Sequence, residues 1–158
     1  MFRTRRLSTS ALALLALGLA GTVAVAADAP APMAPEAMAW GDAPPVLPAG
    51  AKITVLSGNP MAEGPFVLRL KFPGGYEVPA HFHSGDELIT VVSGTFGVGH
   101  GDKLDRAMGT VLPAGGFVEM PAGHHHYAWA ETDTVVQIHG PGPFDMTYID
   151  PADDPLTQ

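Results

Sequence analysis

Short apolar runs separated by turn-forming residues follow one another from residue 53 to residue 149. Many are rich in β-branched and aromatic residues, and this pattern is typical of the short strands of a sandwich or barrel. Only residues 102–108 (DKLDRAM) are expected to form a helical turn. The pattern therefore predicts an all-β domain. The predicted strands are Ile53–Leu56, Phe66–Phe72, Tyr76–His83, Glu87–Ser93, Phe96–His100, Phe117–Met120, His125–Trp129, Val135–His139 and Phe144–Ile149.

Residues 1–26 have the pattern of a secretory signal peptide. Arg3, Arg5 and Arg6 precede an apolar run at residues 11–26 that ends in Ala-Val-Ala, the small-residue pattern of a cleavage site. A Pro/Ala-rich stretch follows instead of a basic flank, which argues against a membrane anchor once the peptide is removed. The Arg5-Arg6 pair leaves both the general secretory route and the twin-arginine route open. We therefore expect a periplasmic or secreted protein.

Proline and alanine dominate residues 27–50, and this composition predicts a flexible arm with polyproline character. Trp40 interrupts the arm, and its large apolar surface is expected to dock either on the outside of the barrel or on a partner subunit. A homodimer is one assembly that the barrel edges and this arm would allow. The predicted organisation is thus a signal peptide (1–26), an arm (27–50), a β-barrel domain (51–150) and a tail (151–158).

The charge and composition exclude several classes of function. Removing residues 1–26 leaves five basic and sixteen acidic residues, a formal charge of −11 with histidine neutral. Such a chain repels phosphate backbones, so we expect no nucleic-acid partner. The chain has no cysteine, which excludes disulfides and a cysteine-type structural zinc site.

The chemistry-bearing residues gather in the stretch from Gly75 to Gly94, GYEVPAHFHSGDELITVVSG. His81 and His83 are two residues apart and would project from the same face of a strand. Ser84-Gly85-Asp86 is turn-forming, so a hairpin would bring Glu87 back beside the two imidazoles. Two imidazoles and a carboxylate predict a site for a divalent transition metal.

This stretch resembles the first motif of the cupin superfamily, with Gly75, His81, His83, Glu87 and Gly94 at the motif positions. The stretch from Gly115 to Ala130, GGFVEMPAGHHHYAWA, resembles the second cupin motif. Gly115, Pro121, Gly123 and His126 match that motif, whereas Ala130 stands where the family has Asn. The resemblance covers Lys52 to Ile149.

The resemblance implies a single-domain, cupin-type jelly-roll β-barrel in which His81, His83, Glu87 and His126 hold a metal ion. The metal would be Fe, Mn, Ni, Cu or Zn, and neither the sequence nor the resemblance selects one. Cupins with this ligand pattern include dioxygenases, decarboxylases, isomerases and lyases. No catalytic acid or base can be assigned from the sequence, and the loss of the motif's Asn removes one polar group.

Strand alternation predicts which other side chains share the barrel interior with the metal ligands. Glu77 and Pro79 would point inward with His81 and His83, and Ala80 and Phe82 outward. Ile89, Val91 and Ser93 would follow Glu87 inward, whereas Tyr127 and Trp129 would occupy the face opposite His126, Ala128, Ala130 and His124. His124 and His125 are either hydrogen-bonding partners of a ligand or polar turn residues. His100 is expected in solvent, and His139 as a structural histidine.

Two hypotheses for the function follow. The first is a metal-dependent enzyme, of the oxidoreductase (dioxygenase), decarboxylase or isomerase type, acting on a small oxygen-rich or aromatic compound. The second is a non-catalytic module that binds a metal or small ligand.

Overall fold

The protein is described by a computed structural model covering residues 31–157, in which Met33 onward forms one compact unit. The predicted signal peptide lies outside the described residues. In the part of the chain that is described, no helix is long and apolar enough to cross a membrane.

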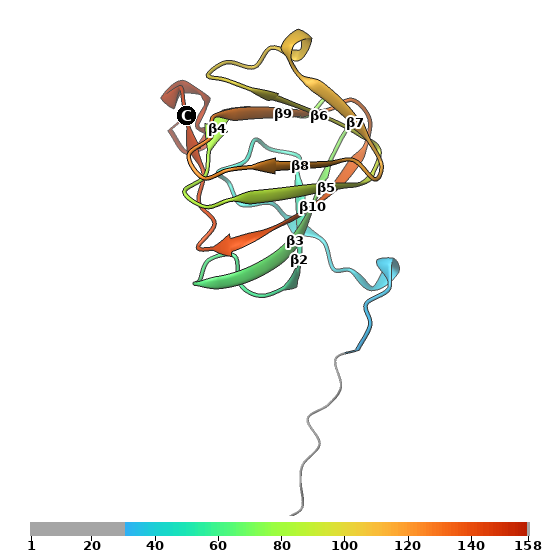
Figure 1. The fold of residues 1–158 in the computed structure, drawn as a ribbon. Helices are drawn as coiled ribbons and strands as arrows, with labels where there is room; N and C mark the ends of the chain where they lie inside the picture. The colour runs from blue at the N-terminus through green and yellow to red at the C-terminus, as the bar shows by residue number, and fades with distance from the viewer. Residues whose placement is uncertain (1–30, 158) are drawn as a thin grey trace, which may run out of the picture. The chain divides into compact units, whose positions relative to one another are not determined.

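Two antiparallel sheets form the fold (Figure 1). The six-stranded sheet has the order β1-β2-β3-β10-β5-β8, and the five-stranded sheet has the order β11-β4-β9-β6-β7. The strands are β1 (Gly41–Asp42), β2 (Lys52–Ser57), β3 (Gly64–Phe72), β4 (Glu77–Phe82), β5 (Glu87–Ser93), β6 (Thr95–His100), β7 (Thr110–Pro113), β8 (Phe117–Met120), β9 (His126–Ala130), β10 (Thr134–Gly142) and β11 (Thr147–Tyr148). Four short 3-10 turns complete the described chain: η1 (Pro35–Ala37), η2 (Arg106–Met108), η3 (Pro151–Asp153) and η4 (Pro155–Thr157).

The core lies between the two sheets because alternate residues of each strand face inward. In β3 the inward positions are Phe66, Leu68, Leu70 and Phe72, all buried. The neighbouring strands β10 and β5 contribute Val136, Ile138, Ile89 and Val91, and the opposite sheet contributes Val78, Phe96, Val98, Ala128 and Ala130. Buried and less buried side chains alternate in this way because successive side chains of a strand point to opposite faces of the sheet. The predicted all-β, jelly-roll class is confirmed.

A second, smaller apolar cluster lies on the outer face of the five-stranded sheet. Tyr127 and Trp129 of β9 are each 1 % exposed and pack with Ala80, Leu104 and Ile149. The Tyr127 hydroxyl donates to the Asp105 carbonyl, so the loop that carries η2 is held over these rings. The two aromatic rings therefore face away from the metal ligands, as the strand alternation predicts.

The end of the predicted arm is in contact with the barrel. β1 pairs with β2, and Lys71 Nζ lies 4.6 Å from the centre of the Trp40 ring. The hydroxyls of Tyr76 and Tyr148 donate to the carbonyls of Pro48 and Val46. Burial raises the pKa of Tyr76 to about 12, which keeps this phenol a donor. Trp40 thus docks on the barrel, which was one of the two expected positions.

Apart from shifts at strand ends, the predicted strands differ from the observed ones in three places. Gly41–Asp42 form β1 within the predicted arm, where no strand was expected. Residues 110–113 form β7, which lacks a strong apolar pattern because it is an edge strand with exposed side chains. The predicted strand Phe144–Ile149 is reduced to β11, and Phe144 instead contributes a ring packed against Phe66. The helical turn expected in residues 102–108 is η2, capped by the Asp105 carboxylate, which accepts from the Ala107 amide.

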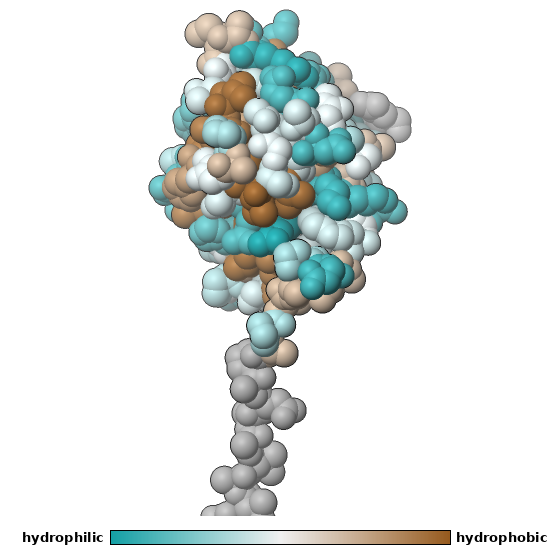
Figure 2. Space-filling view, turned by 90° about the vertical axis from the view of Figure 1, so that its right-hand side faces the viewer, coloured by the Kyte–Doolittle hydropathy of each residue, from teal (hydrophilic) through white to brown (hydrophobic). Residues whose placement is uncertain are grey.

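Exposed hydrophobic side chains are scattered over the surface. On the face shown in Figure 2 they form small separate clusters among hydrophilic residues. The large exposed apolar residues are Met33, Val55, Met61, Val92, Met108, Val111, Phe117 and Leu156. The expected homodimer stays a prediction.

A substitution at Gly97 tests the packing of the apolar cluster around Tyr127 and Trp129. A Cβ at this position would overlap the Trp129 indole, whereas a Cβ on Gly41 would meet nothing. We expect Gly97→Ala to destabilise the protein by about 1–3 kcal/mol, as overpacking of a filled site does. Urea unfolding checks this, with Gly41→Ala as the matched control. A Gly97→Ala variant as stable as the control would contradict the packing described here.

Candidate metal centre

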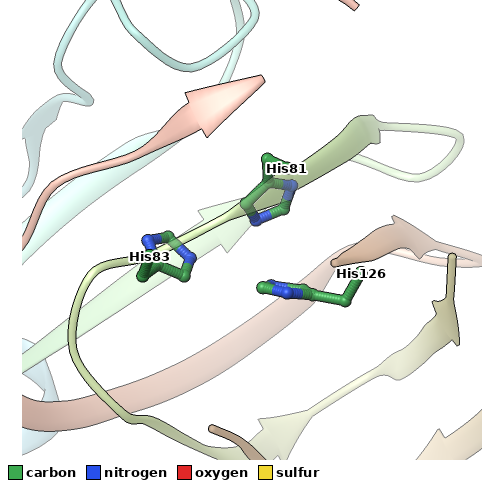
Figure 3. Close-up of side chains that lie close together, drawn as sticks. All are labelled: His81, His83 and His126. Carbon is green, nitrogen blue, oxygen red and sulfur yellow. The ribbon is translucent and has the colours of Figure 1, made fainter. Parts of the chain in front are cut away.

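Three histidines lie close together in space (Figure 3). His81 lies near the end of β4 and is paired across the sheet with His126, the first residue of β9. His83 follows β4 in the short connection to β5, which Glu87 begins. The alternation of β4 therefore sends His81 and His83 to the same side, and pairing with β9 adds His126.

Two hydrogen bonds hold the two histidine-bearing stretches together. The Asp86 carboxylate accepts from the Ala122 amide at 2.9 Å, and the Gly123 amide donates to the His83 carbonyl at 2.8 Å. Gly123 has a φ of +72°, in the left-handed region that glycine adopts without strain. The turn residues of both motifs therefore fix the distance between His83 and His126.

The imidazole rings are close enough to share one ligand. The ring centres of His81 and His126 are 4.2 Å apart, and His83 lies 5.0 Å from the first and 5.3 Å from the second. One ring nitrogen from each histidine lies within 4.8 Å of the corresponding atoms of the other two. All three rings are at most 5 % exposed. This group could hold a metal ion.

Glu87, the first residue of β5, lies beside two of the three histidines. Its Oε2 atom lies 3.4 Å from His83 Nε2 and 3.3 Å from His126 Nε2. Glu87 Oε2 and His83 Nε2 are nevertheless buried without a hydrogen-bond partner. Buried polar atoms are almost always satisfied, and two orphaned ones facing each other are what a cation between them would explain. The residues present therefore fit a metal ion with nitrogen and oxygen donors.

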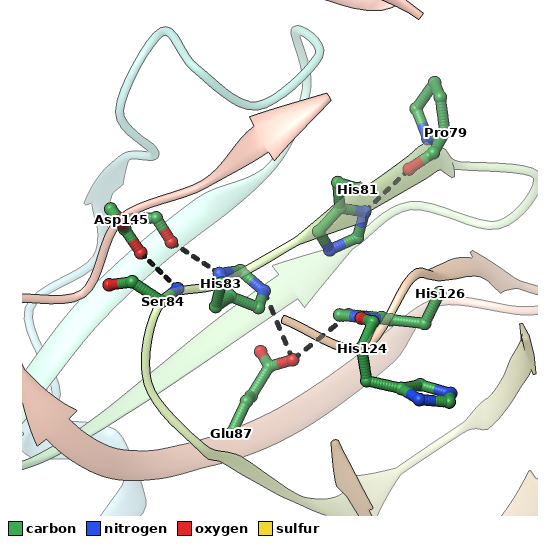
Figure 4. Close-up of polar contacts among 8 residues, drawn as sticks. All are labelled: Pro79, His81, His83, Ser84, Glu87, His124, His126 and Asp145. Carbon is green, nitrogen blue, oxygen red and sulfur yellow. Dashed lines mark hydrogen bonds and ion pairs between the residues drawn. The ribbon is translucent and has the colours of Figure 1, made fainter. Parts of the chain in front are cut away.

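Backbone carbonyls set the orientation of all three rings (Figure 4). The Nδ1 atoms of His81, His83 and His126 donate to the carbonyls of Pro79 (2.6 Å), Asp145 (2.5 Å) and His124 (3.0 Å). Because a carbonyl can only accept, each Nδ1 carries the hydrogen. In the neutral ring the Nε2 lone pair is then free, which is the tautomer that binds a metal.

Further contacts fix His83. The Asp145 carboxylate accepts from the Ser84 amide at 2.8 Å, while its carbonyl holds the His83 ring. Phe144 stacks on the same ring with centres 4.4 Å apart. The segment between β10 and β11 therefore clamps His83 from one side. No signal in the sequence identified Phe144 or Asp145 as site residues, because both lie outside the two motifs.

The three histidines and the carboxylate shift one another's protonation. Burial, with the neighbouring His126 and His83, lowers the pKa of His81 to about 3. Burial also lowers the pKa of His83, but the Glu87 carboxylate and the Asp145 carbonyl outweigh it, so that the pKa is raised. Burial raises the pKa of Glu87, yet its contacts with His126 and His83 hold it well below its usual range. Glu87 is therefore a carboxylate at neutral pH.

The strand alternation predicted for β4 is wrong at Glu77. Val78 pairs with Ala128 and His81 with His126, so two residues of β4 oppose one residue of β9. This bulge shifts the alternation, and Val78 points into the core while Glu77 pairs with Arg106 at 2.8 Å on the outside. Ser93, also predicted inward, is exposed at the end of β5.

The other histidines lie outside the group. His100 Nδ1 is 2.8 Å from His124 Nε2, and both side chains are exposed, so the predicted inward position of His124 is wrong. His125 contacts the Asp102 carboxylate at 2.6 Å and stacks on Phe82. His139 lies on β10 between the inward Ile138 and Gly140, opposite Leu88 of β5. The predictions for His100 in solvent and His125 as a turn-region polar residue agree with these positions.

A cavity of about 410 Å³ opens over the histidine group. Its walls are strand residues such as Leu68, Leu70, Ile89, Val136 and Ile138. Its rim is formed by residues 44–47, 60–61, 144–146 and Leu156. This volume is within the range of about 300–1,000 Å³ usual for small-molecule sites.

Two facing antiparallel sheets with a buried histidine group between them define the protein as a cupin. Within that superfamily, the chain belongs to the family described as the ChrR cupin-like domain, whose profile matches residues 29–145. The cupin prediction is therefore confirmed. No curated protein matches the sequence significantly.

Solved structures show the same fold. An RmlC-like cupin from Ralstonia eutropha JMP134 is 21 % identical, with a TM-score of 0.59 over 78 % of this chain and 74 % of that one. The polyketide cyclase RemF from Streptomyces resistomycificus is 17 % identical, with a TM-score of 0.56 over 66 % and 75 %. A variant of salicylate 1,2-dioxygenase from Pseudoaminobacter salicylatoxidans is 15 % identical, with a TM-score of 0.52 over 62 % and 30 %. At these identities the similarity establishes the fold alone.

The raised pKa of His83 predicts how metal binding depends on pH. A proton on this imidazole must leave before the ring can bind a cation, so we expect affinity to increase as the pH rises through that pKa. His81 and Glu87, with lowered pKa values, are already deprotonated and contribute no further dependence. Calorimetric titration with Zn²⁺ between about pH 6 and about pH 8 measures this effect. An affinity that does not change over this interval would contradict the protonation pattern.

Proposed function

We propose that the protein is an exported, metal-dependent enzyme that acts on a small organic compound. The observation that carries the proposal is the buried group of His81, His83 and His126, with Glu87 beside two of them, in the lining of an apolar cavity, and with two polar atoms left without a partner. Oriented Nε2 lone pairs beside a carboxylate are a donor set for a divalent transition metal.

His81, His83 and His126 would supply nitrogen and Glu87 would supply oxygen to the metal. Donors of this kind suit Fe, Mn, Ni, Cu or Zn, and they leave the choice among these open. When bound, such an ion acts as a Lewis acid toward an oxygen of the substrate or, if redox-active, in chemistry with dioxygen.

The chain's own contribution is orientation and exclusion of water. The carbonyls of Pro79, Asp145 and His124 hold the rings, and the apolar strand residues leave few partners for water in the cavity. A low-polarity site strengthens the interaction of a bound substrate with the charged group at its base.

Among the described residues that line the cavity, Asp145 is the one ionisable residue outside the ligand set. The Ser84 amide holds the pKa of its carboxyl below the usual value, so Asp145 is charged at neutral pH and could accept a proton but not donate one. It is exposed, however, and we assign no catalytic acid or base. The proposed reaction is therefore kept at the level of dioxygenase-, decarboxylase- or isomerase-type chemistry.

The names of structurally similar proteins support an enzyme, because a polyketide cyclase and a salicylate 1,2-dioxygenase share this fold. A second candidate is a module that binds a metal or ligand without converting it. The absence of a buried proton donor outside the histidine group, among the described cavity residues, favours this alternative. Formation of a product from a bound compound separates the two candidates.

Metal content tests the site itself. We expect close to one transition-metal ion per chain, and its loss from the His81→Ala/His83→Ala double variant, because two of three nitrogen donors are removed. His139→Ala removes a histidine outside the cavity and serves as the control. Elemental analysis of the purified proteins gives the stoichiometry. Metal retained by the double variant, or absent from a folded wild type, would refute the proposed centre.

Export rests on the sequence of residues 1–26. We expect the protein expressed from the full sequence in a Gram-negative host to be recovered from the periplasm with Ala27 as its first residue. Intact mass and N-terminal sequencing check this. Full-length protein confined to the cytoplasm would contradict the export prediction.

A further inference from the structure

The walls of the cavity are apolar, whereas its base carries the histidines and Glu87. Among the described residues that line it, the polar ones are His81, His83, His126, Glu87 and Asp145. All the others are aliphatic, aromatic, methionine or proline, and none is Ser, Thr, Asn, Gln, Tyr, Lys or Arg. Pro44, Pro45 and Pro60 at the rim lack amide hydrogens as well.

This lining has a direct consequence for hydroxylated ligands. A hydroxyl group taken out of water needs a hydrogen-bond partner, and its burial without one is unfavourable. The walls from β3, β5 and β10 present Leu68, Ile89 and Ile138 where such partners would have to lie. The part of a ligand that extends away from the histidines therefore contacts apolar side chains and binds best if it is apolar itself.

Charge gives the second constraint. As a ligand, Glu87 would supply one negative charge, and a divalent ion held beside it and the histidines would leave one positive charge uncompensated. A single anionic group on the ligand balances it. A second anionic group would lie among apolar side chains, with no Lys or Arg among the described lining residues, and toward the Asp145 carboxylate at the rim.

We infer that the cavity accepts a monoanionic, metal-chelating compound whose remaining body is apolar and uncharged, and that it discriminates against polyhydroxylated compounds and dianions. This inference rests on the proposed metal site, and it adds the substrate class. The selective elements are the apolar strand residues of the walls and the rim segments that close over them.

A series of 2-hydroxy acids with the same six-carbon skeleton tests the inference. 2-Hydroxyhexanoate, gluconate and 2-hydroxyadipate carry the same chelating head. They differ only in whether the tail is a plain alkyl chain, bears hydroxyls, or ends in a second carboxylate. Binding to the Co²⁺-loaded protein is followed by calorimetry and by the Co²⁺ absorption spectrum, so the readout does not depend on turnover. We expect 2-hydroxyhexanoate to bind at least about tenfold more tightly than either of the others.

A substitution at the rim tests the charge argument separately. Met61 lines the cavity with a side chain that is 75 % exposed, so Met61→Lys places a cation at the rim without burying it. We expect this variant to bind 2-hydroxyadipate at least about threefold more tightly than the wild type does. Met108→Lys is the matched control, because Met108 is 77 % exposed on η2 and does not line the cavity.

The outcomes separate the two levels of the proposal. Co²⁺ binding with similar affinities for all three acids would overturn the inferred substrate class and leave the metal site intact. A wild-type protein that binds no Co²⁺ would overturn the metal site on which the inference rests. An equal gain in 2-hydroxyadipate affinity in Met61→Lys and Met108→Lys would show that general surface charge, rather than the cavity, determines selectivity.

Discussion

The burial of three imidazoles and one carboxylate inside an apolar barrel is the constraint on which the site depends. Ionisable groups withdrawn from water are unfavourable unless each has a partner. Here the Nδ1 atoms donate to the carbonyls of Pro79, Asp145 and His124, whereas Glu87 Oε2 and His83 Nε2 have no hydrogen-bond partner and are left for a cation. The same hydrogen bonds that make burial tolerable also fix the tautomer of each ring. The hydrogen bonds from the three Nδ1 atoms to backbone carbonyls therefore also orient the Nε2 atoms that would bind the metal.

The rest of the fold supports this arrangement. The bulge in β4 lets Val78 fill the core while His81 and His83 still face the cavity, and it sends Glu77 to the outside, where Arg106 pairs with it. A regular strand would have placed the Glu77 carboxylate among apolar residues. On the other face of the sheet, Tyr127 and Trp129 anchor β9, the strand that begins with His126.

The β-barrel fold and the histidine group could be predicted from the sequence, whereas the bulge in β4 and two of the residues that contact His83 were missed. The spacing of His81, His83 and Glu87 predicts a strand followed by a turn. Both are formed by residues close in sequence, so the positions of these three side chains could be predicted without knowing the rest of the fold. The bulge was missed although Pro79 lies in it, because proline inside a strand is typical of several positions, bulges among them, and the register is set by β9. Phe144 and Asp145 were also missed, because their contacts with His83 arise from pairing of β11 with β4 across about 60 residues of chain.

The rim and the base of the cavity come from different kinds of structure. The base is built on strand ends, whereas the rim consists of loop segments at residues 44–47, 60–61 and 144–146, and of Leu156. Substitutions in the loops can therefore reshape what the site admits without disturbing the ligand geometry, which would let related chains diverge in specificity around a constant centre. Phe144 and Asp145 are the exceptions, because both belong to the rim and also contact His83. At these two residues, a change in specificity and a change in the centre cannot be separated.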